Sequence, residues 1–155
     1  MFHLINRIKS MQSLKIVSMA VALFFATTAQ LNSQCKSYIK RNCVPKLAPY
    51  AHSGQLNKTI LFPGDKAEIM LTFYSGMDYR IVVCSEVILG KVTYKVMDMD
   101  RNLIFDSAKN KDKTSFDFKV ASTQQLMVEI NVPQPAVEPE ILPQGCVAVV
   151  VGYKD

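Results

Sequence analysis

Four cysteines are the residues of this chain best placed to do chemistry: Cys35, Cys43, Cys84 and Cys146. An even number of cysteines in a chain that matures in an oxidising compartment is typical of disulfide bonds. We therefore expect all four to be structural disulfide cysteines. Their spacing disfavours zinc, because structural zinc sites use close C-x₂₋₄-C pairs. The C-x-x-C motif of thiol oxidoreductases is absent.

The pairing of these cysteines depends on the structure of residues 35–43. The apolar positions 35, 38, 39 and 43 have helical spacing. A helix would separate Cys35 from Cys43 by about 12 Å along its axis, which is too far for a disulfide. The two would then join the helix to Cys84 and Cys146. The alternative is a closed loop with its own Cys35–Cys43 bond, which leaves Cys84 to pair with Cys146.

Two further motifs could do chemistry, and neither is complete. His52 is the one histidine after residue 29, and it stands in a turn-rich stretch without a nucleophile-elbow motif. Asp98-Met-Asp-Arg-Asn102 resembles the start of a calcium loop, but Leu103 replaces the required glycine and Lys109 the final acidic ligand. We interpret these as a loop histidine and a polar turn. We therefore expect no catalytic residue, no cofactor and no metal site, and a protein that is not an enzyme.

The first 29 residues have the layout of a secretory signal peptide. They carry three basic residues and no acidic one, and the apolar run Ile16–Ala26 is followed by small residues. That run has 11 residues, whereas a spanning helix needs about 20. The alternatives are a short retained anchor, or a lipid on Cys35, for which Gln34 is a poor match. The start is open between Met1 and Met11, and we expect export to the periplasm, the outer membrane or the exterior.

The distribution of charge along the chain disfavours nucleic acids as partners. The formal net charge is +5, but after residue 29 the chain has 15 basic and 13 acidic residues. Nucleic-acid binding needs a clustered basic face, so we expect no nucleic-acid partner. Membrane contact is expected only through the signal segment before cleavage, and the oligomeric state is left open.

From about residue 55 the hydrophobic period is two. The expected domains are a signal peptide at 1–29, an N-terminal helix and linker at 30–54 and a β-sandwich at 55–155. About eight short strands separated by Gly, Pro, Asn and Asp predict an all-β fold, an antiparallel jelly-roll-like β-sandwich. Cys146–Tyr153 is almost wholly apolar, which indicates a central strand buried on both faces.

Three connections carry further expectations. Ser75–Asp78 is predicted to be a hairpin turn, and Ala108–Lys113 a lysine-rich hairpin tip that is either a solvated turn or a surface for anions. The segment Pro133–Pro143 holds four prolines in 11 residues. Such a segment is semi-rigid and extended. It is either a plain connector or a loop that carries binding.

Several motifs together resemble a group of uncharacterised exported proteins of Gram-negative bacteria. They are Leu61-Phe-Pro-Gly-Asp65, Phe73-Tyr-Ser-Gly-Met-Asp-Tyr-Arg-Ile-Val-Val-Cys84, Asp117-Phe-Lys-Val120, Ser122-Thr-Gln-Gln-Leu126 and Gly145-Cys-Val-Ala-Val-Val-Val-Gly152. That group is similar to the small β-sandwich modules of secreted peptidases and adhesins. The resemblance implies export and a sandwich fold, and it brings no activity.

The sequence thus predicts an exported, non-enzymatic binding or structural module of the cell envelope, which recognises a protein partner or a surface glycan. The alternative is a small secreted hydrolase, or an inhibitor of a hydrolase.

Overall fold

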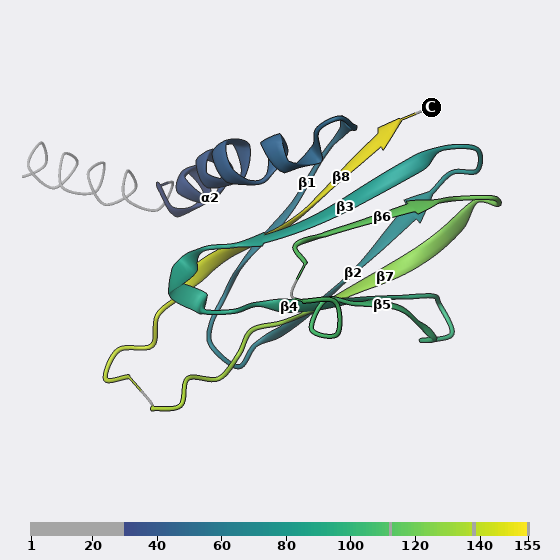
Figure 1. Ribbon diagram of the computed structural model, residues 1–155. Coiled ribbons are helices and arrows are strands. Elements are labelled where there is room, and N and C mark those ends of the chain that lie inside the picture. Colours follow the sequence, from purple (N-terminus) through teal and green to yellow (C-terminus); the bar gives the residue numbers. More distant parts are fainter. Residues whose placement is uncertain (1–29, 112, 138, 155) are drawn as a thin grey trace, which may run out of the picture. The chain divides into compact units, whose positions relative to one another are not determined.

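The computed structural model describes residues 30–111, 113–137 and 139–154 (Figure 1). The predicted signal peptide, 1–29, lies outside these residues. From Cys35 onward the chain forms one compact unit; of the separate unit Met1–Gln34, only Gln30–Gln34 is described. Within the described ranges, no helix has both the length and the apolar character needed to cross a membrane.

The predicted N-terminal helix is confirmed as α2, Gln30–Asn42, which is followed by the short 3₁₀ helix η1, Val44–Leu47. The apolar stripe of α2 is buried, and Ile39 at its centre is fully covered. Lys40 and Arg41 lie in the last turn, where positive side chains stabilise a helix by interacting with the negative end of its dipole. The α-helix ends at Asn42, because Pro45 has no amide hydrogen with which to continue the i to i−4 hydrogen bonds.

In the part of the chain that the structure describes, eight strands form two antiparallel four-stranded sheets, so the predicted β-sandwich is confirmed. Sheet A has the order β1-β8-β3-β6 and sheet B the order β2-β7-β4-β5. This is the order of a jelly roll, in which most connections cross from one sheet to the other. The bounds are β1 Ala51–Leu61, β2 Lys66–Phe73, β3 Asp78–Ser85, β4 Thr93–Met97, β5 Leu103–Asp106, β6 Ser115–Lys119, β7 Gln124–Asn131 and β8 Gly145–Lys154, with a 3₁₀ turn η2 at Val87–Leu89.

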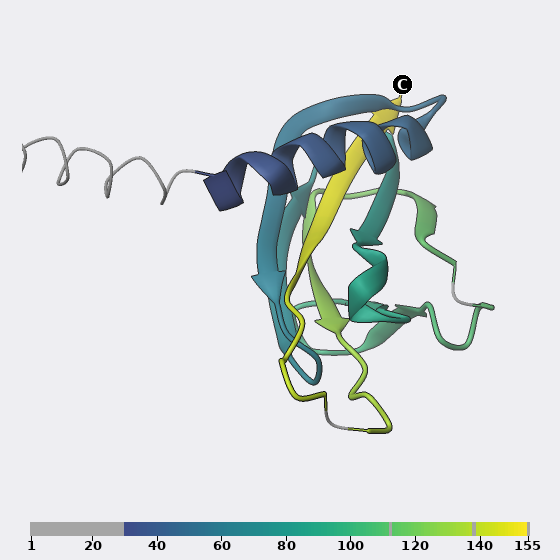
Figure 2. The same ribbon diagram turned by 90° about the vertical axis from the view of Figure 1, so that its left-hand side faces the viewer.

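Strand β8 is buried on both faces, as its apolar sequence predicts. Val147, Val149 and Val151 belong to the core between the sheets. Cys146, Ala148 and Val150 belong to a second apolar cluster on the outer face of sheet A, together with residues of α2. Figure 2 shows the helix crossing this outer face in front of β8. The described part of the unit therefore has three layers, which are helix, sheet A and sheet B.

Two predicted hairpins are wrong. Ser75–Asp78 links β2 of sheet B to β3 of sheet A, and Ala108–Lys113 lies in the connection from β5 to β6, which also changes sheet. Turn residues reverse the chain, but pairing follows from which sheet buries the next strand. Strand β1 also begins at Ala51, before the predicted sandwich boundary at 55, because its first residues pair with the end of β8 beyond an irregularity between His52 and Leu56.

Candidate functional site

The cysteines meet under the helix. Cys35 is bonded to Cys146 of β8, with Cα atoms 5.5 Å apart. This bond confirms that the helix is joined covalently to the sheet, and it excludes the closed-loop pairing of Cys35 with Cys43. It also leaves Cys35 without a thiol for a lipid.

The second predicted bond is not closed in the structure. Cys43 and Cys84 are free thiols, both buried. The neighbouring Cys84 thiol, together with burial, raises the pKa of the Cys43 thiol. In the described residues no group of three or more His, Cys, Asp or Glu side chains could hold a metal ion.

His52 and the calcium-like motif are both held by local hydrogen bonds within the fold. His52 lies in β1 rather than in a loop, and its Nδ1 accepts a hydrogen bond from the Gly54 amide at 3.2 Å. Asp98 follows the last residue of β4 and begins a tight turn. Its carboxylate accepts the Asp100 and Asn102 amides at 2.9 and 2.8 Å. The side chain of Asn102 is the main cause of a lowered Asp98 pKa. The motif is therefore the polar turn that the sequence predicts.

One end of the sandwich gathers three connections, which we call the loop end: Phe62–Asp65, residues 86–92 and residues 132–144. Hydrogen bonds hold the ends of these connections. The Val132 amide donates to the Asp65 carbonyl at 2.9 Å, and the Gly64 amide to the Val132 carbonyl at 3.2 Å. On the other side, the Glu86 amide donates to the Cys146 carbonyl at 2.9 Å, while the Glu86 carboxylate accepts the Cys146 amide at 2.8 Å. Both roots of the proline-rich connection are thus fixed to the sandwich.

Between these roots the proline-rich connection extends beyond the strand ends in both views (Figures 1 and 2). Its apolar side chains face solvent, with Val137 81%, Ile141 84% and Leu142 50% exposed. Val87 and Ile88 of η2 are also exposed, at 92% and 60%. The sequence indicated the proline-rich segment but missed Val87 and Ile88. The available signal was an apolar pair between Glu86 and Gly90, outside any alternating strand.

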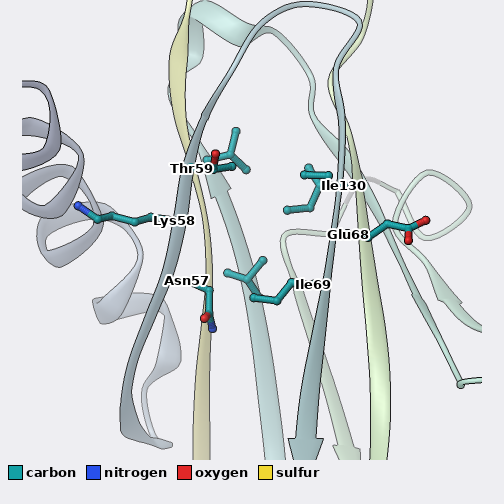
Figure 3. A pocket seen from close by; sticks show the side chains of 9 residues that line it. Asn57, Lys58, Thr59, Glu68, Ile69 and Ile130 are labelled. Atoms are coloured by element: carbon teal, nitrogen blue, oxygen red, sulfur yellow. The ribbon is translucent and has the colours of Figure 1, made fainter.

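A second feature is a groove along the side of the sandwich where β1 and β2, the edge strands of the two sheets, face each other. Figure 3 shows Thr59, Ile69 and Ile130 pointing into the space between these strands, while Lys58 and Glu68 point away. The hollow here has a volume of about 270 Å³, and Val147 and Val149 also line it. The Nδ2 atom of Asn57 on its wall is buried without a hydrogen-bond partner.

The groove continues toward the opposite end as a second hollow of about 320 Å³. Its lining has tyrosines and short polar side chains, which are Ser53, Gln55, Thr72, Tyr74, Tyr79 and Tyr153, beside Leu71, Phe73, Met77 and Val151. Tyr74 is 63% exposed. Sequence alternation placed most tyrosines in the core and did not reveal that two edge strands would border this groove.

Comparison with known proteins gives a limited result. No family model matches the chain, and no curated protein matches it. Among solved structures, it is similar to PliG of Aeromonas hydrophila, a periplasmic lysozyme inhibitor of g-type lysozyme, with a TM-score of 0.47, 9% identity, and coverage of 68% of this chain and 89% of that one. It is also similar to a de novo designed double-stranded β-helix, with a TM-score of 0.28, 12% identity, and coverage of 64% and 99%.

Proposed function

We propose that this protein is an exported, non-enzymatic binding module of the cell envelope and that the loop end contacts a protein partner. The observation that carries the proposal is the set of five apolar side chains, each at least half exposed, on two connections with fixed roots. Single exposed apolar residues are ordinary, whereas a group of them at one end marks an interaction surface. Loops on a rigid scaffold are the usual carriers of binding residues.

Burial of these side chains would supply the affinity. A fully buried aliphatic side chain stabilises by roughly 1.5–3 kcal/mol relative to an exposed one. The prolines of the connection reduce its freedom in the free state, so less conformational entropy is lost on binding. One partner class with a matching shape is a secreted hydrolase, because a projecting loop can enter a substrate cleft and block it. Inhibition of a hydrolase is thus a special case of this proposal.

The test is capture of partners from an envelope extract by the immobilised wild-type protein and by two variants. Val137→Asp/Ile141→Asp places charges on the loop end. Met99→Asp is the matched control, because Met99 is an exposed apolar residue of the β4–β5 turn, away from the loop end. We expect the double variant to lose at least about tenfold of the captured partner and the control to keep it.

The outcome that overturns the proposal is equal capture by the wild type and the double variant, or turnover of a peptide or glycan by the pure protein. Residual activity of purified secreted glycosidases and peptidases, measured with and without the protein, tests the special case of inhibition.

A surface glycan is a second candidate ligand, and the groove favours it through one observation. The buried, unpartnered Nδ2 of Asn57 is a donor that a hydroxyl or carbonyl oxygen would satisfy. Tyr74 offers an exposed ring farther along the same groove. A glycan array with wild type, Asn57→Ala and Tyr74→Ala tests this: binding that both variants retain, or no binding at all, excludes the groove as a glycan site.

A further inference from the structure

The outer face of sheet A holds a cluster of four sulfurs in apolar surroundings. Cys35 and Cys43 come from the helix side, Cys84 from β3 and Cys146 from β8, and none is more than 4% exposed. Cys84 lies opposite Ala148 in the ladder, two residues from Cys146 and on the same face of the sheet. The sheet therefore presents two neighbouring sulfurs to the helix, and one of them is already bonded to Cys35.

Cys43 and Cys84 belong to the same buried cluster at the contact between helix and sheet. Each thiol is the main cause of the shifted pKa of the other, as expected for side chains that lie close together. Hydrogen bonds hold the backbone close to each of the two cysteines. The Tyr38 hydroxyl donates to the carbonyl of Ser85, the residue after Cys84, at 2.5 Å, and the Cys43 amide donates to the Ile39 carbonyl at 2.9 Å. The pair therefore lies in the same contact between helix and sheet as the bond that joins Cys35 to Cys146.

We propose that Cys43 and Cys84 form a second disulfide in the mature protein, which ties the end of α2 to β3 while the Cys35–Cys146 bond ties an earlier turn to β8. In the reaction the two thiols lose two protons and two electrons, and an S–S bond forms. The oxidant is a disulfide, either oxidised glutathione or the catalytic disulfide of a thiol oxidase. It accepts the electrons and protons and becomes two thiols.

The surroundings of the pair determine when this bond forms. Thiol–disulfide exchange needs the oxidant to reach one of the two sulfurs, and in the folded protein both Cys43 and Cys84 are buried. Ile39, Val82 and Val150 fill the same cluster and keep solvent and oxidant away. The bond therefore closes during folding, before the helix is fully packed on the sheet.

Two bonds give the helix a fixed position. The cluster under α2 contains Val82, Ala148 and Val150 of the central strands, which would be exposed if the helix left the sheet. With one bond the end of the helix can still open around Cys35. With two bonds, on different strands, α2 is a permanent layer of the sandwich rather than a lid.

The test uses the full chain. It is reduced and unfolded, then refolded in a glutathione redox buffer; remaining thiols are alkylated, and unreduced peptides are mapped by mass spectrometry. We expect no alkylated cysteine and a peptide pair linked through Cys43 and Cys84. Alkylation of both residues beside an intact Cys35–Cys146 bond, or links from either residue to another cysteine, overturns the proposal.

Variants separate the bond from ordinary packing. Cys35→Ala/Cys146→Ala leaves only the proposed pair, and we expect no free thiol after refolding and a fall of the Tm when reductant is added. The variant with all four cysteines changed to Ala should show no effect of reductant. Two titratable thiols in the double variant contradict the proposal, and the peptide map of the wild type decides the question if the double variant does not fold.

Discussion

Arg80 is the residue that fastens the segment after the helix to sheet A. Its guanidinium donates to both carboxylate oxygens of Asp117 at 2.7 and 2.6 Å, and to the Ala48 carbonyl at 2.6 Å. The ring of Tyr50 lies 4.6 Å from its Cζ atom. One side chain thus joins β3, β6 and the segment that leads from η1 into β1.

The ion pair predicts a pH dependence. The hydrogen bond from Arg80 is the main cause of an Asp117 pKa below its ordinary value of 3.8. A lowered folded-state pKa adds stability that is complete above the unfolded pKa and is lost as the pH falls through the folded value. We expect Asp117→Asn to cost about 1 kcal/mol at pH 7, since the pair is partly exposed.

Urea unfolding of the wild type and Asp117→Asn between pH 7 and pH 2.5, spanning the ordinary carboxyl pKa, measures this difference. The gap should shrink as the pH falls below 3.8. Asp98 also has a lowered pKa, but it is present in both proteins and cancels. A gap that stays constant with pH contradicts the assignment.

Gly152 is a second residue whose type has a clear physical reason. A Cβ atom there would lie 2.8 Å from the Cβ of Tyr50 and 3.1 Å from a methyl of Leu47. The missing side chain lets the segment after α2 approach β8 closely. We expect Gly152→Ala to destabilise by about 1–3 kcal/mol through overpacking, measured by thermal or urea unfolding. Unchanged stability would show that the segment after α2 can move away from β8 with no loss of free energy of unfolding.

At the scale of elements, α2 is the one layer that the sandwich alone does not explain. The outer face of a sheet in a two-layer sandwich is usually polar, but here β8 and β3 carry Ala148, Val150, Val82 and Cys84 on it. The helix covers these residues with its own apolar stripe. Apolar residues at the outward-facing positions of a strand thus indicate that a third layer covers that face of the sheet.

A substitution of Ile39 tests how much the helix layer contributes to the free energy of unfolding. It is fully buried at the centre of the stripe, so Ile39→Ala leaves a cavity, and we expect a loss of about 2–4 kcal/mol. Lys36→Ala is the control on the exposed side of the same helix and should change the free energy of unfolding by less than about 0.5 kcal/mol. Similar values for the two variants, by urea denaturation, would mean that the helix adds little to stability.

At the scale of the whole molecule, the jelly roll separates the scaffold from the loop end. Main-chain hydrogen bonds join Phe62–Asp65 to Val132, and Glu86 to Cys146 at the start of β8. The apolar tip of the proline-rich connection makes no contribution to the core clusters. Stability and binding should therefore respond to different parts of the chain.

Replacement of residues 135–142 by Gly-Ser-Gly tests this separation. Loop length changes the free energy of unfolding only weakly, so we expect a change within about 1 kcal/mol. The same variant should lose the partner captured by the wild type. A large loss of stability would mean that the connection is part of the scaffold, and retained capture would place the binding surface elsewhere.

The sequence by itself determined the helix, the number of strands and the fold class. Helical spacing of Cys35, Ile39 and Cys43 is a local property, and so is the period of two in strands such as β7. The apolar run of β8 also predicted correctly that both of its faces are buried. These features are local, because the side chains that a helix or strand must bury recur at a fixed spacing along the chain.

Only the tertiary structure decided which strands pair, which cysteines meet and which surfaces form. The turns at Ser75–Asp78 and Ala108–Lys113 read as hairpins because a turn sequence specifies a reversal and not a partner strand. The joining of Cys35 to Cys146, the approach of η2 to the proline-rich connection and the groove between β1 and β2 each bring together residues far apart in sequence. Their positions are set by the packing of two sheets and a helix, which no local pattern contains.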